Sequence, residues 1–197
     1  MKKLILAGLL VSSALNASTL YPTDIKSVYL TQDSKDVAGK LLPTNAIEVL
    51  EQSAGKIKFS LKGYVNPAAP NVIYYSNQDR IIALSFAKTK TPKYEIIKKG
   101  ETGKWDEVKV IAYTTKDNLE KDLKPMLDRA KQTYQESCSI CHHLHKESQY
   151  NPNQWPSLFK SMLSRTPIDK KDEWLIIQYL QKASKGDIKW KPIEENF

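Results

Sequence analysis

Residues 55–65, GKIKFSLKGYV, carry the clearest structural pattern of the chain. Ile57, Phe59 and Leu61 alternate with lysine and serine residues. An extended backbone therefore places the apolar side chains on one face and the polar side chains on the other. The segment predicts an antiparallel strand with one face buried.

Short apolar runs of a similar kind recur between residues 20 and 114. The polar tetrad NQDR at residues 77–80 separates two of these runs and predicts a hairpin turn. Many short strands joined by turns indicate a small barrel or sandwich. We expect residues 19–115 to form a β-rich domain, with further strands near Val28, Val49, Ile73, Ile81 and Val108.

After residue 115 the apolar spacing changes to three or four residues, which is typical of one face of a helix. Pro125 lies within this pattern, so the helix either kinks or begins there. A last helix is predicted after Thr166, where Pro167 and Asp169 complete a helix-start signal. The predicted fold class is α+β, with a small N-terminal β-barrel followed by an all-α domain over residues 116–197. The apolar positions are Leu119, Leu123, Met126, Leu127, Ala130 and Tyr134 in the first helix, and Trp174, Ile177, Leu180 and Ala183 in the last.

Residues 1–18 have the layout of a secretory signal peptide. Two lysines precede an apolar run from Leu4 to about Leu15, and small residues follow at Ala17 and Ser18. The alternative is an uncleaved membrane anchor, but the run is shorter than the roughly 18 residues that a spanning helix needs. We expect an exported, periplasmic chain without a transmembrane span in its mature form.

The chain is basic, with a formal net charge of +8. Its lysines are spread along the sequence, whereas nucleic-acid-binding proteins usually concentrate lysine and arginine on one face or tail. This distribution argues against a nucleic-acid partner. It favours charge steering towards another protein.

The motif CSICH contains both cysteines of the chain, Cys138 and Cys141, followed directly by His142. In c-type cytochromes two such thiols bond covalently to one haem, and the adjacent histidine binds the iron from the same side. The motif predicts one covalent haem c attached through Cys138 and Cys141, with His142 as an axial ligand. We therefore expect residues 116–197 to form a monohaem cytochrome c domain.

Three other uses of the two thiols fit the sequence less well. A thioredoxin-like redox pair is expected near a βαβ pattern, which this part of the chain lacks. A zinc site normally has its histidines a dozen or more residues from the cysteines. A structural disulfide across two residues closes so short a loop that it removes little entropy from the unfolded chain.

The second axial ligand must reach the opposite face of the porphyrin. His143 and His145 follow His142 closely, so we expect them at exposed or edge positions. Met126 lies on the apolar helical face and is expected in the core. Met162 stands some twenty residues beyond the motif, which is far enough for the chain to fold over the ring, and it is the predicted ligand.

Two segments of the β-rich part, VYLTQDSKDVAGKL (28–41) and NAIEVLEQSAGKIKFSLKGYV (45–65), resemble bacterial SH3-like domains. Those domains also run from a first strand through a glycine-containing turn to a strand that ends in glycine, an aromatic residue and valine. The resemblance covers about forty residues. It implies that residues 19–115 form an SH3-like docking module.

The segment CSICHHLHKESQYNPNQWPSLFKSM (138–162) resembles the C-terminal monohaem domain of membrane-tethered multihaem cytochromes that serve periplasmic trimethylamine N-oxide reductases. FSLKGYVNPAAPNVIYYSNQDRIIALSF (59–86) is similar to the region before that domain. The resemblance implies electron delivery to a molybdenum-containing N-oxide or S-oxide reductase. The family's usual N-terminal tetrahaem part is missing here, so we expect a separate membrane quinol-oxidising cytochrome as the electron donor.

These observations favour an electron-transfer protein without enzymatic activity. A haem peroxidase or gas sensor is the first alternative, and it requires an open or displaceable sixth coordination position. A haem-anchored assembly subunit of a respiratory complex is the second. A methionine-ligated haem at Met162 distinguishes the electron carrier from the first alternative.

Overall fold

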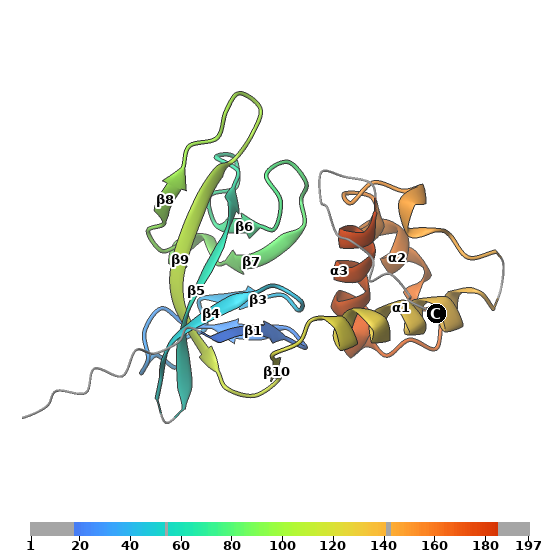
Figure 1. Ribbon diagram of the computed structural model, residues 1–197, viewed down its shortest axis with the longest axis horizontal. Helices are drawn as coiled ribbons and strands as arrows, with labels where there is room; N and C mark the ends of the chain where they lie inside the picture. Colours follow the sequence, from blue (N-terminus) through green and yellow to red (C-terminus); the bar gives the residue numbers. More distant parts are fainter. Residues whose placement is uncertain (1–17, 54, 141–142, 185–197) are drawn as a thin grey trace, which may run out of the picture.

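The computed structural model describes residues 18–53, 55–140 and 143–184. A curved β-sheet comes first in the chain and a group of helices follows it (Figure 1). Residues 1–17 of the predicted signal peptide lie outside the described residues. Within the described part, no helix is long and apolar enough to cross a bilayer.

The sheet has ten strands in the part of the chain that the structure describes. Eight of them follow one path in the order β10-β1-β4-β5-β6-β7-β3-β2, while β9 pairs with β5 and β8. A bridge between Tyr29 and Tyr113 brings the end of β2 towards β9, so the sheet curls into a half-barrel. The strands are β1 (Ser18–Pro22), β2 (Lys26–Val28), β3 (Gly39–Leu41), β4 (Ile47–Gln52), β5 (Lys56–Val65), β6 (Val72–Tyr74), β7 (Ile82–Phe86), β8 (Glu95–Lys98), β9 (Asp106–Thr115) and β10 (Leu119–Glu120).

Strands β5 and β9 form the longest pair of this sheet. Ten residues of each strand pair antiparallel, from Lys56↔Thr115 to Val65↔Asp106. The alternation read from residues 55–65 is confirmed, because Ile57, Phe59 and Leu61 are buried in the sheet core. The hairpin predicted at residues 77–80 is also confirmed, since it joins the antiparallel strands β6 and β7.

Gly63 is the point at which β5 comes closest to β6. A Cβ atom added there would lie 2.5 Å from Ile73 Cγ2 and 2.6 Å from the carbonyl oxygen of Tyr74. Side chains with a Cβ do not fit into that space. The glycine therefore permits the close approach of the two strands.

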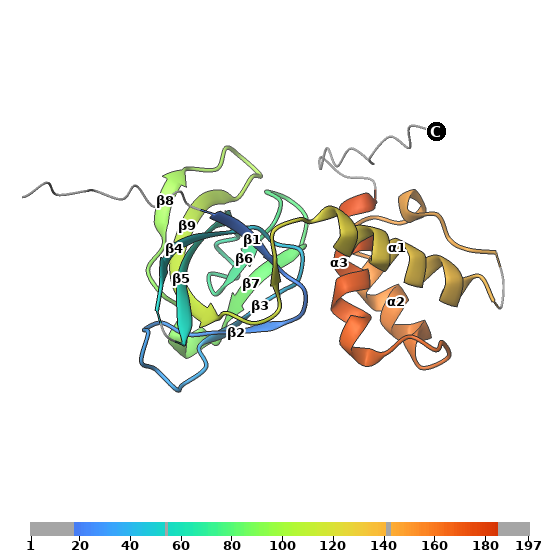
Figure 2. The same cartoon turned by 60° about the horizontal axis from the view of Figure 1, so that its bottom comes forward.

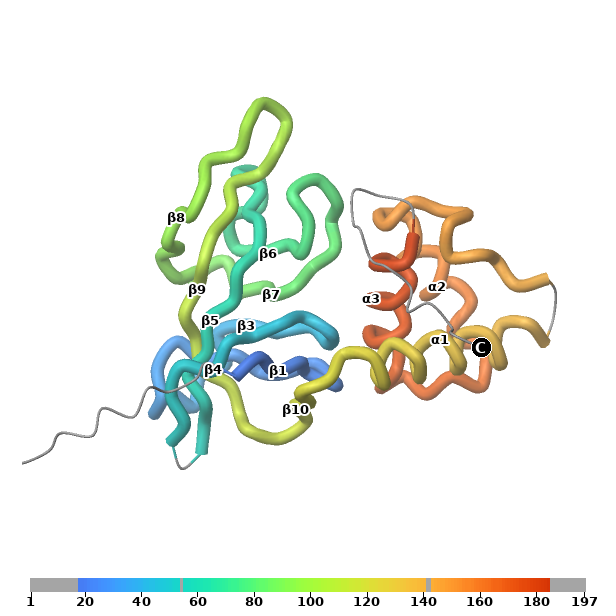
Figure 3. The backbone as a smooth tube through the Cα atoms, viewed as in Figure 1, coloured from blue at the N-terminus to red at the C-terminus, as the bar shows by residue number. Residues whose placement is uncertain are grey.

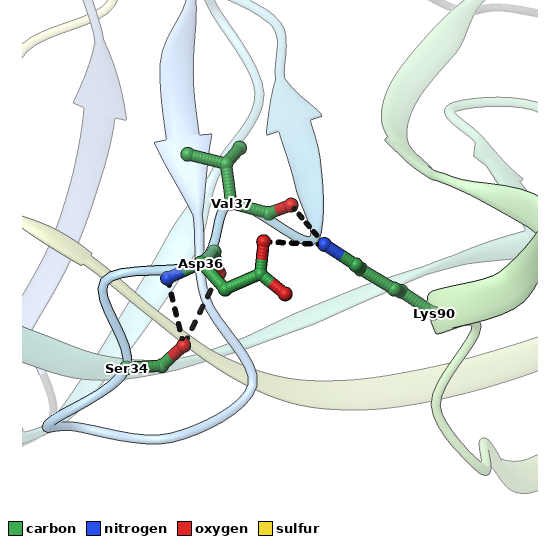
Figure 4. Close-up of polar contacts among 4 residues, drawn as sticks. All are labelled: Ser34, Asp36, Val37 and Lys90. Atoms are coloured by element: carbon green, nitrogen blue, oxygen red, sulfur yellow. Dashed lines mark hydrogen bonds and ion pairs between the residues drawn. The ribbon is translucent and has the colours of Figure 1, made fainter.

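The loop before β3 is fixed to the one-turn helix η1 (Lys88–Lys90) (Figure 4). Lys90 Nζ bonds a carboxylate oxygen of Asp36 and the carbonyl oxygen of Val37. Ser34 Oγ accepts a hydrogen bond from the backbone N–H of Asp36 at 3.1 Å. The contacts join segments that are more than fifty residues apart in the sequence.

Three short α-helices follow the sheet in the described residues. The predicted helix from Leu119 to Tyr134 begins later than its apolar pattern, because Leu119 belongs to β10 and pairs with Pro22. Pro125 lies in the first turn, where a missing N–H costs nothing. The helices are α1 (Lys124–Cys138), α2 (Trp155–Leu163) and α3 (Glu173–Ala183), with one-turn helices η2 (Glu147–Gln149) and η3 (Lys170–Asp172) before α2 and α3.

The prediction of an all-α domain after residue 115 was wrong. The protein is mostly β, and the helices described after the sheet are short, at 15, 9 and 11 residues. The expected start of the last helix was also wrong. Asp169 caps η3 by accepting a hydrogen bond from the N–H of Lys171, and α3 begins only at Glu173.

The helix α3 is buried on all sides and joins the helices to the sheet. It lies on the side of the helical group nearer to the sheet (Figures 1 and 2), and the continuous trace in Figure 3 shows how the chain reaches it last. Gln178 Nε2 donates to the carbonyl oxygen of Ile82 at 2.9 Å. Lys182 Nζ donates to Thr44 and Asn45 in the loop before β4. The helices therefore share buried polar contacts with the sheet, and they do not form the self-contained all-α domain that the sequence suggested.

Candidate functional site

A cavity of about 150 Å³ opens on the helical side of the protein, away from the sheet core. It contains sulfur from two different helices, because α1 contributes Cys138 and α2 contributes Met162. Its full lining is Tyr134, Ser137, Cys138, His145, Met162, Arg165 and Thr166.

The cavity residues of α1 lie on one face of that helix because of their spacing in the sequence. Tyr134, Ser137 and Cys138 are three and four residues apart, so they lie on one face of the helix. Cys138 is the last residue of α1 and is partly buried. Burial raises the pKa of its thiol, whereas the reactive thiols of dithiol redox proteins have lowered pKa values. This environment does not favour the thioredoxin alternative.

Met162 lies near the end of α2, where the helix stops at Leu163. The backbone N–H of Arg165 donates to the carbonyl oxygen of Met162 at 2.9 Å, and Thr166 Oγ1 donates to the carbonyl oxygen of Leu163. These bonds satisfy carbonyls that the helix end would otherwise leave without donors. They also bring Arg165 and Thr166 to the rim of the cavity.

The remaining predicted site residues divide into three groups. Cys141 and His142 lie outside the described residues. Met126 is buried in the helical core, as predicted. His143 is exposed, in agreement with its expected position.

His145 is the residue that sequence reasoning set aside and the structure brings to the cavity. Its Nδ1 lies 3.1 Å from Gln149 Oε1. Its ring contacts the edge of Tyr150, with ring centroids 5.3 Å apart. The argument from the short sequence distance to His142 did not anticipate these contacts of His145 with Gln149 in η2 and with Tyr150.

The segment between α1 and α2 has little regular structure of its own, yet buried side chains satisfy its backbone. The hydroxyl of Tyr134 donates to the carbonyl oxygen of His145 at 2.7 Å. Trp155 Nε1 donates to the carbonyl oxygen of Glu147 at 3.1 Å, and the hydroxyl of Tyr179 donates to the Glu147 carboxylate. Each of the three helices thus supplies at least one donor to this segment, and α3 supplies a second through Gln181 Nε2, which donates to the carbonyl oxygen of Pro152 at 2.9 Å.

The cavity fits the group that the CSICH motif implies, as far as its described residues go. A thiol at Cys138 and a thioether at Met162 line one space, as attachment and iron ligation of a haem require. Tyr134 adds aromatic surface to the cavity, and its ring packs against the buried Trp155 with ring centroids 6.1 Å apart. The donor set therefore suits a haem better than a hard metal ion, which prefers oxygen ligands.

Comparison with known proteins identifies the family of the chain. The family model described as "TorC third cytochrome c domain" matches residues 15–119, which is more than half of the chain. The chain belongs to the TorC third cytochrome c domain family. The matched residues include strands β1 to β9 and end at Leu119, the first residue of β10.

Similar full-length proteins include members from two organisms. The cytochrome c-type protein TorC of Escherichia coli K12 is 25% identical over 171 residues, covering 84% of this chain and 44% of TorC. The cytochrome c-type protein TorY of Haemophilus influenzae is 27% identical over 183 residues, covering 88% of this chain and 49% of TorY. The chain therefore spans about half the length of these relatives.

Both of these matches are too long to fit within the sheet alone, so they include part of the helical segment as well. No solved structure matches the chain. The predicted resemblance to SH3-like domains stays a prediction. Family membership makes haem c the expected cofactor of the TorC third cytochrome c domain.

Proposed function

We propose that the protein is an exported monohaem c-type cytochrome that passes electrons to a molybdenum-containing N-oxide or S-oxide reductase. The observation that carries the proposal is that Cys138 and Met162, on different helices, line the same cavity. Membership of a cytochrome c family and the CSICH motif support the same cofactor.

In this proposal Cys138 and Cys141 would hold one haem through thioether bonds, and His142 and Met162 would be the ligands of its iron. Haem c supplies one-electron redox chemistry at its iron. The thiol and thioether positions are partly buried, and a methionine ligand favours the reduced state relative to a second histidine. The protein's own task is to hold both ligand positions still while an electron enters and leaves.

The proposed partners follow from the relatives and from charge. The similar proteins are named cytochrome c-type proteins TorC and TorY, and the resemblance at residues 138–162 implies a trimethylamine N-oxide reductase system. We propose a periplasmic molybdoenzyme as acceptor and a membrane quinol-oxidising cytochrome as donor. The net charge of +8 suits brief, charge-steered contacts with acidic partners.

We further propose the division of labour predicted from the sequence. Residues 1–18 would direct export, residues 19–115 would dock a partner and residues 116–197 would hold the haem. The buried contacts of α3 with the loop before β4 would then keep the haem-binding part at a fixed position relative to the docking part.

Attachment is tested by denaturing gel electrophoresis followed by a haem stain. The wild-type chain should keep its haem, and no thiol should be titratable. A Cys138→Ala variant should lose one of the two bonds and show an altered reduced absorption band. Haem that can be extracted, or a bound zinc ion in its place, would contradict the proposal.

Met162 is tested against Met126, the other methionine of the helical part. Met162→Ala should remove the sulfur-to-iron charge-transfer band, lower the reduction potential and let external ligands bind the iron. Met126→Ala should mainly lower stability, by roughly 2–5 kcal/mol, because it leaves a cavity in the core. An unchanged spectrum in Met162→Ala would reassign the ligand, and His145 would be the next candidate because it lines the same cavity.

Electron delivery is tested by mixing the reduced protein with a periplasmic molybdenum reductase and its N-oxide or S-oxide substrate. Reoxidation should need both, and its rate should fall as salt screens the positive charge. Omission of either the reductase or the substrate should leave the haem reduced. Equally fast reoxidation by hydrogen peroxide alone would contradict the electron-carrier function. It would support the alternative, a haem peroxidase or gas-sensing protein.

A further inference from the structure

The contacts of Tyr134 set it apart from the other side chains of the cavity. It lines the cavity and also donates its hydroxyl hydrogen to the carbonyl oxygen of His145 at 2.7 Å. Only 1% of its surface is exposed, and the bond itself is partly buried. Loss of the hydroxyl would leave the carbonyl oxygen of His145 without this donor in a partly buried place, which costs stability.

The same bond closes a circuit of aromatic contacts. The Tyr134 ring meets Trp155 edge-on at 6.1 Å, Trp155 meets Tyr150 at 5.2 Å and Tyr150 meets His145 at 5.3 Å. The hydroxyl of Tyr134 then returns to the backbone of His145. Each pair stands edge to face, which is a favoured arrangement of aromatic rings. The circuit fixes the backbone and the ring of His145 together.

We propose that Tyr134 is a positioning residue for the haem, because it holds His145 and the chain that leaves the CSICH motif against the cavity. This inference rests on the proposed function. The hydroxyl does not act on the iron. It keeps His145 in the wall of the cavity that Met162 also lines, so that external molecules compete less well with the methionine for the iron.

The direct test replaces Tyr134 with phenylalanine, which keeps the ring and removes only the hydroxyl. Thr114→Val is the matched control, since Thr114 is fully buried and its hydroxyl also donates to a backbone carbonyl, that of Ser27, at 2.8 Å. That bond lies in the sheet. Tyr179→Phe serves as a second comparison, because it releases the Glu147 carboxylate but keeps the contact of Tyr134 with His145.

Two measurements on the haem-loaded protein separate the inference from the proposed function. Hydrogen exchange of the amides in residues 143–150 reports opening of the segment and does not depend on the iron. Binding of imidazole, followed in the absorption spectrum, reports access to the iron. The loss of about 1–2 kcal/mol with one partly buried hydrogen bond corresponds to a roughly 5- to 30-fold change in either equilibrium.

Tyr134→Phe should raise both the exchange of residues 143–150 and the affinity for imidazole by about this factor. Thr114→Val should lose similar stability and change neither measurement. Tyr179→Phe should speed exchange near Glu147 but leave imidazole binding unchanged. If Tyr134→Phe opens the segment while imidazole binds as in the wild type, the residue is merely structural and the inference fails, although the carrier function would stand. A wild-type protein without bound haem would instead refute the proposed function.

Discussion

The replacement Lys182→Met tests how the helices are held to the sheet. Lys182 is 3% exposed. Its Nζ donates to the carbonyl oxygen of Thr44 at 2.9 Å, to Thr44 Oγ1 at 2.8 Å and to Asn45 Oδ1 at 3.2 Å. It also lies 4.4 Å from the centre of the Tyr75 ring. All three hydrogens of the ammonium group therefore have an acceptor.

Two opposing effects determine how much Lys182→Met changes the free energy of unfolding. Methionine has a similar length and fills the same space, but it leaves the Thr44 carbonyl and the Asn45 amide oxygen buried without this donor. Each such loss costs roughly 1–3 kcal/mol. Methionine also removes the cost of burying a charge, and burial lowers the pKa of Lys182 to about 7. Because the ammonium retains three acceptors and an aromatic ring, we expect the first effect to be larger, with a net loss of about 2–4 kcal/mol at pH 7.

The pH dependence of the stability tests the role of Lys182 more sharply. The folded protein holds the Lys182 proton less tightly than the unfolded chain does, whose lysine keeps the ordinary value of 10.5. Between about pH 7 and pH 10.5 the unfolded chain thus binds more protons, so the wild type gains stability as the pH rises. Lys182→Met lacks this gain, and the gap between the two proteins should widen by at most about 1.4 kcal/mol per pH unit.

The assay is urea unfolding of both proteins at a series of pH values, with the free energy of unfolding extrapolated to water. Lys160→Met is the matched control. Lys160 is partly exposed, pairs with Glu173 at 3.2 Å and lies over the Trp174 ring, so its replacement should change stability by less than about 1 kcal/mol. A Lys182→Met protein as stable as the wild type, or a gap that stays constant from pH 7 to pH 10, would refute the reasoning.

Three further predictions concern the sheet. Gly63→Ala should separate β5 from β6 and cost at least about 1–3 kcal/mol in urea unfolding, because the new methyl group would overlap Ile73 and the Tyr74 carbonyl oxygen; unchanged stability would mean that the strands can move apart freely. Phe59→Ala, at a fully buried position, should cost roughly 3–5 kcal/mol by the same assay, and a loss below 1 kcal/mol would show that the core closes over the space. Hydrogen bonds with Thr115 and Lys26 lower the pKa of Asp117 from 3.8 to about 2. The ionised carboxylate therefore stabilises the fold above about pH 4, and this stabilisation is lost as the pH falls towards 2. Asp117→Asn should remove that part of the acid sensitivity, and identical acid unfolding curves of the two proteins would contradict the prediction.

The strands could be read from the sequence because local chemistry and burial agree there. Alternation in residues 55–65 predicted the face on which Phe59 is buried, and the structure confirms it. Leu119 was misplaced because its four-residue spacing to Leu123 suits a helix. Pairing with Pro22, almost a hundred residues away, places it in a strand instead. Sequence patterns do not show such distant partners.

The prediction of the fold class was wrong for the same reason, because it also depended on contacts between distant parts of the chain. The last helix was expected to bury one face only, that of Trp174, Ile177, Leu180 and Ala183. In the structure Gln178 and Lys182 are buried too, because the loop before β4 and strand β7 provide their hydrogen-bond partners. Polar residues that look exposed in the sequence thus join the helices to the sheet.

The candidate site was partly visible in advance. The motif pointed to Cys138, and its distance along the chain pointed to Met162; the structure brings both to one cavity. His145 and Arg165 were missed as cavity residues. Their positions depend on the turn at η2 and on the end of α2, and neither leaves a periodic pattern in the sequence.

The contacts of Lys182 with Thr44 also bear on the order in which the protein folds. They join residues 138 positions apart in the chain. Contacts of such long range close a large loop, and they usually form late, after local structure has reduced the entropy of the chain. We therefore expect the sheet and the helices to reach their own structure first and to dock only near the end of folding. Replacement of Lys182 should then accelerate unfolding and leave the folding rate nearly unchanged, which corresponds to a φ-value close to zero.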